Sequence, residues 1–210
     1  MILSEAVTLF GVFLLTLVMP GADFACVVRE SVMYGRRAGI LAAIGIGLTI
    51  LFHVAYTVLG LGIVIAQSIL AFTLIKWAGA AYLVFIGVMS LRAKAPERVE
   101  VLDRPAAELR SARRSFGIGV LTNLLNPKAA LFFVSLFTVI VSHDTPAVVK
   151  AGYGVAMALM VAIWFTLVAV FFTTPKVRLA FARFGRWINR VTGLVFLALG
   201  VRLALQRAAP

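Results

Sequence analysis

The stretch TNLLNPK, residues 122–128, interrupts a mostly apolar segment that covers residues 116–141. This segment is longer than the roughly 20 residues that a helix needs to cross a bilayer. Its proline removes a backbone donor and clashes with the preceding turn, so we expect the helix to break there. A lysine within such a span costs about 2.5–3.5 kcal/mol on insertion scales, and broken backbone at this depth is tolerated only inside protein or beside a wet cavity. Asn123, Asn126 and Lys128 therefore predict a site within the membrane.

The stretch PGAD, residues 20–23, makes a second interruption in the first apolar segment. Pro20 breaks the helical hydrogen-bond ladder, and Gly21 loosens the same turn. Asp23 adds a carboxylate, for which two interpretations are open. It is a functional group in the membrane, the N-cap of a helix that restarts after the break, or both. If this first span ends near Val28, Asp23 lies closer to the inner end of the span than to the middle of the membrane.

Composition predicts a polytopic membrane protein with one compact domain, residues 1–210. Of its 210 residues 62% are hydrophobic and 13% are charged, and the mean hydropathy is +1.05, far outside the range of soluble proteins. We expect no cleaved signal peptide, because the first residues include Glu5 and no basic residue. Six apolar stretches are long enough to span a bilayer and predict an all-α fold: residues 6–28, 39–66, 69–92, 116–141, 148–173 and 188–206.

The basic residues predict how the chain is oriented. Fifteen of the twenty lysines and arginines lie in or beside the links after the first, third and fifth stretches, and three lie on the opposite side. Because cytoplasmic loops carry such an excess, we expect those three links in the cytoplasm and both termini outside. The same distribution argues against a nucleic-acid-binding protein, which the net charge of +12 alone would suggest.

The chain divides into two halves of three spans, about residues 1–92 and 116–210, joined by the hydrophilic residues 93–115. Pro20 and Pro127 interrupt the first span of each half. An odd number of spans sets the halves in opposite orientations, and paired interruptions in such inverted repeats point to the binding site of a transporter. The sequence therefore predicts six transmembrane helices in two inverted three-helix repeats, with the first and fourth helices interrupted.

These interruptions resemble the motifs of the lysine-exporter (LysE/RhtB-type) family of bacterial amino-acid efflux transporters. The similarity rests on PGAD at residues 20–23 and NLLNPKA at residues 123–129, with GRRAG at 35–39 and GAAYL at 79–83 as weaker patterns. Ala22 departs from it, because the family usually has a second proline at this place. The resemblance implies proton-driven efflux of amino acids or related metabolites by antiport, and a homodimer that crosses the bacterial inner membrane several times.

The residues expected to form the site are two groups of opposite charge and three polar ones: Asp23, Lys128, Asn123, Asn126 and Tyr82. A zwitterionic amino acid needs an anionic partner for its ammonium and a cationic partner for its carboxylate, and Asp23 and Lys128 supply both signs. Without substrate we expect these two to neutralise each other, because an unpaired buried charge costs several kcal/mol. Protonation of Asp23 would then couple transport to proton entry. For Tyr82, a pocket wall and an ordinary buried aromatic are equally open.

Three other classes of protein fit these residues less well. A divalent-cation transporter, the main alternative, needs several carboxylate or thiolate ligands, whereas the spans offer only Asp23 with Cys26 nearby. An enzyme needs a nucleophile or a metal cluster, and the two histidines, His53 and His143, lie on separate segments. A lone histidine such as His53 is more often a packing residue than a proton carrier. An assembly subunit gives no reason for paired broken helices. We therefore expect no enzymatic activity, no cofactor and no bound metal.

Overall fold

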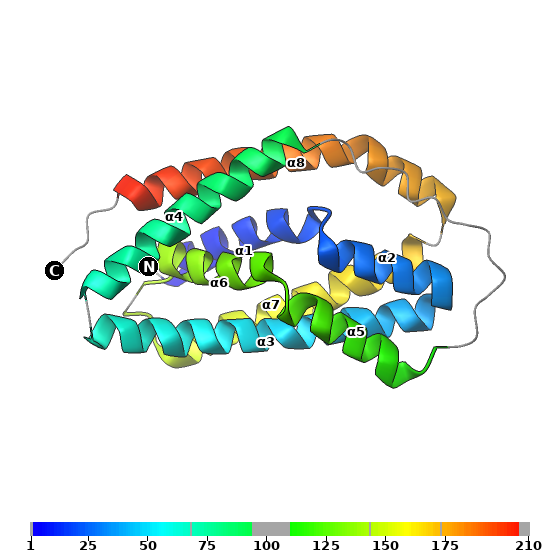
Figure 1. Ribbon diagram of the computed structural model, residues 1–210, viewed down its shortest axis with the longest axis horizontal. Coiled ribbons are helices and arrows are strands. Elements are labelled where there is room, and N and C mark those ends of the chain that lie inside the picture. The colour runs from blue at the N-terminus through cyan, green and yellow to red at the C-terminus, as the bar shows by residue number, and fades with distance from the viewer. Residues whose placement is uncertain (1, 68, 94–109, 143, 173, 206–210) are drawn as a thin grey trace.

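The computed structural model describes residues 2–67, 69–93, 110–142, 144–172 and 174–205 of the chain. These residues form helices joined by short turns, and no strand occurs among them. In chain order the helices of this described part (Figure 1) are α1 (Ile2–Val18), α2 (Ala22–Tyr34), α3 (Arg36–Gln67), α4 (Ile69–Arg92), α5 (Ala112–Leu124), α6 (Pro127–Ile140), α7 (Ala147–Phe171) and α8 (Pro175–Leu205). The helical fold expected from composition is confirmed for this part of the chain.

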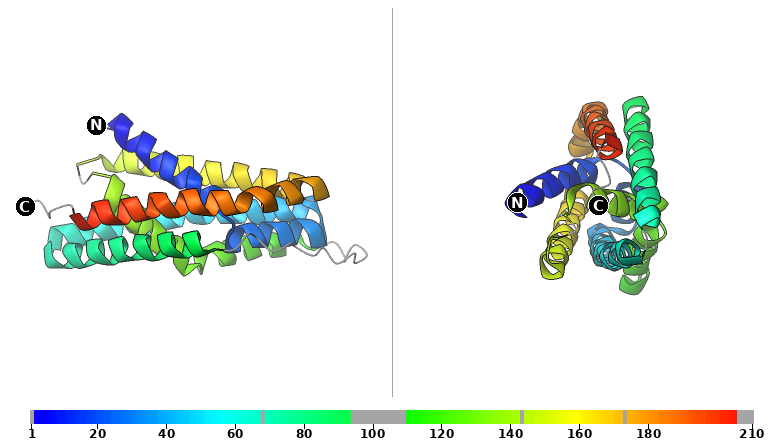
Figure 2. Two further views of the ribbon diagram at one scale, coloured as in Figure 1. Left: turned by 90° about the horizontal axis from the view of Figure 1, so that it is seen from above. Right: turned by 90° about the vertical axis from the view of Figure 1, so that its left-hand side faces the viewer.

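The helices run lengthwise in an elongated bundle with two distinct ends (Figures 1 and 2). At one end α1, α4 and α7 begin and α3, α6 and α8 end, and we call it the terminal end. The α2–α3 turn, the beginning of α5 and the α7–α8 turn lie at the other end. We call this the basic end because exposed arginines lie on it or close to it: Arg29, Arg36, Arg37, Arg113 and Arg114. The described basic links therefore gather at one end of the molecule.

Both predicted interruptions are present, and both lie near the middle of the bundle's length (Figure 1). α1 ends at Val18 and α2 begins at Ala22 after a bend of 50°. Pro20 lies within this break and has no N–H to continue the helical ladder. α5 ends at Leu124, and α6 begins at Pro127 after a bend of 56°. A proline is tolerated in the first turn of a helix, where its missing N–H would have no helical partner.

α2 is longer than the hydropathy pattern suggests, because it continues past Val28 to Tyr34. Asp23 is the second residue of this helix, so about 16 Å of helix separate it from the end of α2. The expectation that Asp23 lies near the inner end of its span is therefore wrong, and Asp23 lies beside the break. The hydropathy pattern ended the span too early because Glu30 is a charged residue, although the fold buries it beside polar partners.

Three of the described helical segments are long and apolar enough to cross a membrane: Arg36–Gly60, Thr73–Arg92 and Ala147–Phe171. Each bent pair, α1 with α2 and α5 with α6, also qualifies when it is taken as one span, which raises the number to five. The sixth predicted stretch falls in α8, which is not among these five. Large apolar side chains such as Phe52, Phe85 and Ile163 are exposed on the outer faces of α3, α4 and α7, as expected of helices that face lipid.

Glycines allow the backbone of α3 to come into contact with the backbones of the neighbouring helices. A Cβ atom at Gly45 would overlap the carbonyl oxygen of Phe116 on α5. A Cβ atom at Gly47 would lie 3.0 Å from the carbonyl oxygen of Ala158 on α7. Small residues at such positions are typical of helix pairs in membranes, where close packing replaces the hydrophobic driving force. α3 is thus fixed between α5 and α7, and its side chains face the break between α5 and α6.

A buried ion pair joins α2 to the start of α5 near the basic end. Glu30 is 1% exposed, pairs with Arg110, and accepts a hydrogen bond of 3.2 Å from the hydroxyl of Ser115. The guanidinium of Arg110 also lies 3.9 Å from the ring centroid of Tyr34, a cation–π contact. The carboxylate of Glu30 is therefore compensated on several sides.

A second buried carboxylate joins α1 to the α6–α7 turn near the terminal end. Glu5 is 8% exposed and accepts hydrogen bonds from the backbone N–H of Ser142 at 2.8 Å and from the hydroxyl of Thr145 at 3.0 Å. Both arms of the first bent pair are therefore tied to the second half of the chain, one near each end of the bundle.

Replacement of Arg110 tests the pair near the basic end. Arg110→Ala leaves Glu30 buried without its cation, and breaking a buried pair in this way costs about 3–5 kcal/mol. We expect a clear fall in the unfolding temperature of the detergent-purified protein, measured by tryptophan fluorescence. Adding Glu30→Gln should recover part of the loss, because it removes the uncompensated charge. The exposed Arg113→Ala is the matched control, and an equal fall in this control would contradict a specific role for the pair.

Candidate functional site

The two helix breaks meet at a pocket with a cavity volume of about 80 Å³. Residues from α1, α2, α3, α5, α6, α7 and both breaks line it. Its polar groups are those of Thr16, Asp23, Asn123, Asn126 and Lys128. The rest of the lining is mostly aliphatic and aromatic, and includes Phe13, Leu17, Ile46, Ile50, Phe132, Phe133, Val161 and Phe165. Four of the five residues expected to form the site therefore lie around one cavity, although they come from positions about 100 residues apart in the chain.

The first break faces the lysine of the second. A Cβ atom at Gly21 would lie 3.9 Å from Nζ of Lys128, so the ammonium group lies beside the bare backbone of the first break. Lys128 follows Pro127 in the first turn of α6. The positive end of a helix dipole disfavours a cation at this position. A negatively charged ligand beside Lys128 would offset the repulsion between its ammonium and the positive end of the helix dipole.

Asp23 does not cap α2. The N-cap residue is Gly21, and its helix receives no side-chain cap hydrogen bond. Instead, Oδ2 of Asp23 accepts a hydrogen bond of 2.8 Å from Nδ2 of Asn123. Its other oxygen, Oδ1, is buried and has no hydrogen-bond partner among the described residues. The structure thus gives one carboxylate oxygen a protein partner and leaves the other without one.

Asp23 and Lys128 line the same pocket but do not form an ion pair. Within the part of the chain that the structure describes, no nitrogen–oxygen contact of up to 4.0 Å joins them. In this conformation the two groups are therefore not in direct contact, and their mutual neutralisation stays a prediction. The physical reason is that the carboxylate is held by the amide of Asn123. The pocket consequently presents two separate charged groups of opposite sign.

The free backbone groups at the second break form hydrogen bonds with side chains of the break itself and of other helices. Asn126 caps α6, because its Oδ1 accepts a hydrogen bond of 3.0 Å from the backbone N–H of Lys128. Tyr82 on α4 donates its hydroxyl to the carbonyl oxygen of Lys128 at 3.0 Å, and Tyr56 on α3 donates to that of Ala130 at 3.2 Å. Tyr82 is not among the residues that line the pocket. The structure thus connects Tyr82 to the backbone of the site rather than to the cavity.

Two residues of α3 belong to the site but were not among those expected from the sequence. The hydroxyl of Thr49 lies 2.6 Å from Oδ1 of Asn123, and Nε2 of His53 lies 3.1 Å from the same atom. Asn123 itself is 2% exposed. The available signal was the polar face that Thr49, His53 and Tyr56 form at helical spacing on an otherwise apolar span. Their partner is 70 or more positions away in the sequence, so the pattern alone does not indicate it.

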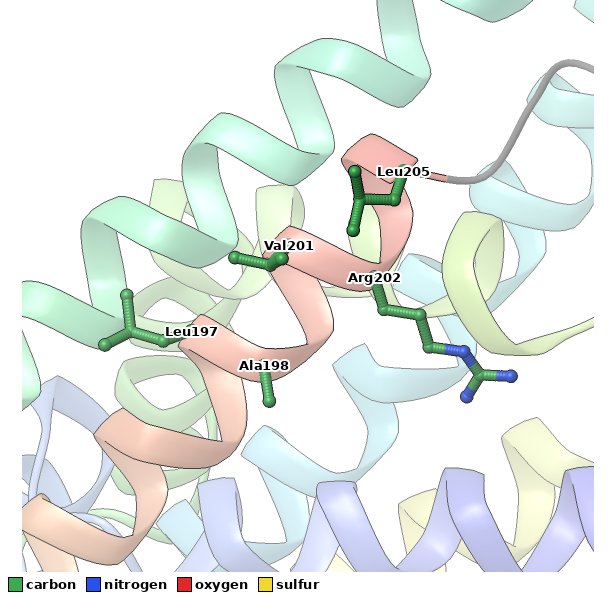
Figure 3. Close-up of a pocket in the computed structure, with 5 residues that line it drawn as sticks. All are labelled: Leu197, Ala198, Val201, Arg202 and Leu205. Carbon is green, nitrogen blue, oxygen red and sulfur yellow. The ribbon is translucent and has the colours of Figure 1, made fainter.

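A larger and more open hollow lies beside α8 towards the terminal end, with a volume of about 710 Å³. It is lined by Leu197, Ala198, Val201, Arg202 and Leu205. Figure 3 shows Leu197 extending towards α4, while Arg202 extends to the other side of α8. Apart from Arg202 its lining is aliphatic, and none of its residues belongs to either break. The smaller pocket between the breaks is therefore the candidate site, despite its size.

Comparisons with known proteins agree with the motifs. Residues 14–207 match the model of the LysE type translocator family. The threonine efflux protein of Salmonella typhi is 32% identical over 200 residues, which cover 95% of this chain and 97% of that protein. The threonine efflux protein of Escherichia coli (strain K12) is 30% identical with the same coverage. The homoserine/homoserine lactone efflux protein of Salmonella typhimurium is 28% identical over 199 residues, 90% of this chain and 91% of the relative. No solved structure matches the chain significantly.

The structure predicts that Asn123 matters more for stability than the single hydrogen bond of Tyr82. Asn123→Ala leaves buried Oδ2 of Asp23 without its partner, which costs about 1–3 kcal/mol, and also removes the side-chain acceptor shared by Thr49 and His53. Tyr82→Phe removes one hydrogen bond, which contributes about 0.5–1.5 kcal/mol. Thermal unfolding in detergent should therefore show a larger decrease for Asn123→Ala. Thr138→Ala is the control, because its hydroxyl bonds only within its own helix, to the carbonyl of Val134. The reverse order of the first two variants would contradict the network.

Proposed function

The chain belongs to the LysE type translocator family, and from this we propose that it exports small neutral amino acids from the cell by proton antiport. The observation that carries the proposal is the pocket between the two helix breaks, which holds one carboxylate and one ammonium group that are not paired with each other. A transport site at paired breaks in the middle of a bundle is the arrangement found in many secondary transporters.

The charges of the pocket match the two ends of an amino acid. The buried Oδ1 of Asp23, which has no hydrogen-bond partner within the described residues, is suited to receive the substrate's ammonium. Lys128 is suited to receive the carboxylate, and its place in the first turn of α6 adds the positive end of a helix dipole. Asn126 and the backbone at Gly21 line the space between the breaks. Tyr82 then has a supporting role, because it holds the carbonyl of Lys128.

The remaining lining supports a small, uncharged substrate side chain. The described pocket lining contains no charged residue besides Asp23 and Lys128. A substrate with a charged side chain would bury that charge without a partner, which costs several kcal/mol. The cavity volume of about 80 Å³ further favours small substrates. Threonine and homoserine, which appear in the names of the relatives, are small and neutral.

Proton antiport follows from competition for one carboxylate. The ammonium of the substrate needs Asp23 ionised, whereas a proton on Asp23 removes the negative charge that holds the substrate. Proton and substrate therefore exclude each other at this residue, which is the requirement for exchange. The same residue thus carries the substrate in one half of the cycle and the proton in the other.

We further propose that the chain crosses the bacterial inner membrane six times as two inverted repeats, about residues 1–92 and 116–210, within a single domain. Corresponding helices of the two halves support this, since α3 packs along α7 and α4 packs along α8 (Figure 1). The gathering of exposed arginines at one end supports a cytoplasmic basic end, with both termini outside. A homodimer remains the expectation from the family resemblance.

No observation favours the alternative of a divalent-cation transporter. In the described part of the chain, no group of three His, Cys, Asp or Glu residues lies close enough together to hold a metal ion. Asp23 has an amide partner instead of other carboxylates. The amino-acid proposal explains both charged groups of the pocket, and a cation site would leave Lys128 without a role.

The charged residues are tested by efflux from cells that are preloaded with amino acids as dipeptides. Asp23→Asn and Lys128→Ala should each lower the efflux rate at least tenfold, because each removes a charged contact to the substrate worth more than about 1.4 kcal/mol. Asp144→Asn and Lys150→Ala, outside the pocket, are the charge-matched controls. An uncoupler should abolish efflux by the unaltered protein. Normal efflux by both pocket variants, with the protein present in the membrane, would contradict the proposed site.

The substrate class is tested with the same cells and a panel of amino acids. We expect export of threonine, serine and homoserine, and no export of lysine or glutamate, because the pocket has no partner for a charged side chain. Faster export of lysine than of threonine would overturn the proposed class while leaving amino-acid efflux in place. If no amino acid leaves faster in the presence of the protein, the proposed function itself is wrong.

A further inference from the structure

His53 lies behind the pocket, where α3 faces the second break. Its side chain is 1% exposed and stacks on the ring of Phe133, with the ring centroids 5.5 Å apart and the planes 5° apart. It is not among the residues that line the pocket. Stacking and burial fix the orientation of the imidazole, so its two nitrogens face defined partners.

The Nε2 atom of His53 faces only hydrogen-bond acceptors. The backbone oxygen of Asn123 lies at 3.3 Å and Oδ1 of Asn123 at 3.1 Å, so Nε2 must carry a hydrogen. The other nitrogen, Nδ1, lies 3.0 Å from the hydroxyl of Tyr56, which can either donate or accept. Tyr56 has a single hydroxyl hydrogen, which it divides between Nδ1 and the carbonyl oxygen of Ala130 at 3.2 Å, whereas the N–H at Nε2 is required by Asn123.

His53 is the dedicated donor to the side chain of Asn123. The hydroxyl of Thr49 also lies 2.6 Å from Oδ1, but the carbonyl oxygen of Ile46 lies at the same distance from that hydroxyl. A hydroxyl has a single hydrogen, so Thr49 divides it between two acceptors. Within the described residues, the N–H of His53 has no acceptor besides the two oxygens of Asn123.

The orientation of Asn123 decides which form of Asp23 is favoured. With Oδ1 held by His53, Nδ2 must point to Asp23, where it donates at 2.8 Å. An amide N–H favours the ionised carboxylate, which only accepts hydrogen bonds. With the amide reversed, its oxygen would face Asp23 and would favour the protonated acid, which can donate. The hydrogen on His53 therefore acts on Asp23 through Asn123.

We propose that His53 is a positioning residue of the transport site, which acts through Asn123 to keep Asp23 ionised for the substrate's ammonium. This rests on the proposed function, in which Asp23 alternates between substrate and proton. Without an N–H at position 53, Asn123 is free to turn its oxygen towards Asp23. Asp23 then keeps its proton to higher pH, and substrate binding needs a higher pH.

Other groups around Asp23 do not replace this effect. Lys128 from α6 lines the pocket and also favours the ionised form of Asp23. Within the described residues, however, its side chain makes no hydrogen bond that would orient the amide of Asn123. Cys26 on the same helix receives a weak hydrogen bond of 3.5 Å from Thr122. From α1 and α7 the pocket lining contributes only uncharged groups, such as Thr16 and Phe165.

The experiment measures binding of radiolabelled threonine to the full-length protein, purified in detergent, across a series of pH values. His53→Phe keeps an aromatic ring against Phe133 but has no N–H. We expect its binding midpoint to lie about one pH unit above that of the unaltered protein, with roughly tenfold weaker binding below that midpoint. His53→Gln supplies an amide N–H and should restore the midpoint. Thr138→Val is the control, because the Thr138 hydroxyl bonds only within its own helix, to the carbonyl of Val134.

An unchanged midpoint in a folded His53→Phe variant would overturn the positioning role and leave the proposed function standing. An equal shift in His53→Gln would also overturn it, because His53 would then act by its own protonation rather than as a fixed donor. If His53→Phe does not fold, Thr49→Val decides the question, since loss of the second donor should shift the midpoint in the same direction by a smaller amount. Absence of threonine binding by the unaltered protein at every pH would instead contradict the proposed function.

Discussion

Backbone groups that two helix breaks free inside an apolar bundle must find partners within the protein, and the rest of the structure depends on this constraint. At the second break, the side chain of Asn126 accepts a hydrogen bond from the N–H of Lys128. The hydroxyls of Tyr82 and Tyr56 donate to the carbonyl oxygens of Lys128 and Ala130. These tyrosines come from α4 and α3, so the break is stable only within the assembled bundle. Of these three residues Asn126 also lines the pocket, whereas the two tyrosines support the break from outside the cavity.

The two breaks satisfy this constraint differently. The second is capped by a side chain, whereas the first begins α2 at Gly21 with no side-chain cap. Asp23 in the first turn of α2 and the nearby ammonium of Lys128 then give the first break its charges. Asn123 connects the two breaks, because it belongs to α5 and its amide holds the carboxylate on α2. The second break is therefore capped by the protein, whereas the first leaves the start of its helix uncapped beside the pocket.

The features that depend on local chemistry were predictable from the sequence. A proline inside a long helical segment removes a hydrogen bond of the helical ladder, so both interruptions and their place in the chain followed from Pro20 and Pro127. The depth of Asp23 did not follow, because α2 continues through Glu30, whose burial depends on a distant arginine. The contact between His53 and Asn123 did not follow for the same reason. The two residues are 70 positions apart, and no periodic pattern on α3 records that contact. The distance between Asp23 and Lys128 did not follow from the sequence either, because charge alone does not fix distance.

The net charge of the pocket determines whether the proposed exchange depends on the membrane voltage. In the proposed cycle the loaded pocket is electrically neutral, since a zwitterion adds no net charge to Asp23 and Lys128. The returning pocket, with Asp23 protonated and Lys128 still cationic, carries one positive charge inwards. Exchange is therefore electrogenic, and the membrane voltage adds up to about 2.3 kcal/mol per 100 mV for each turnover. Cells without a pH gradient would still drive export as long as their interior is electrically negative.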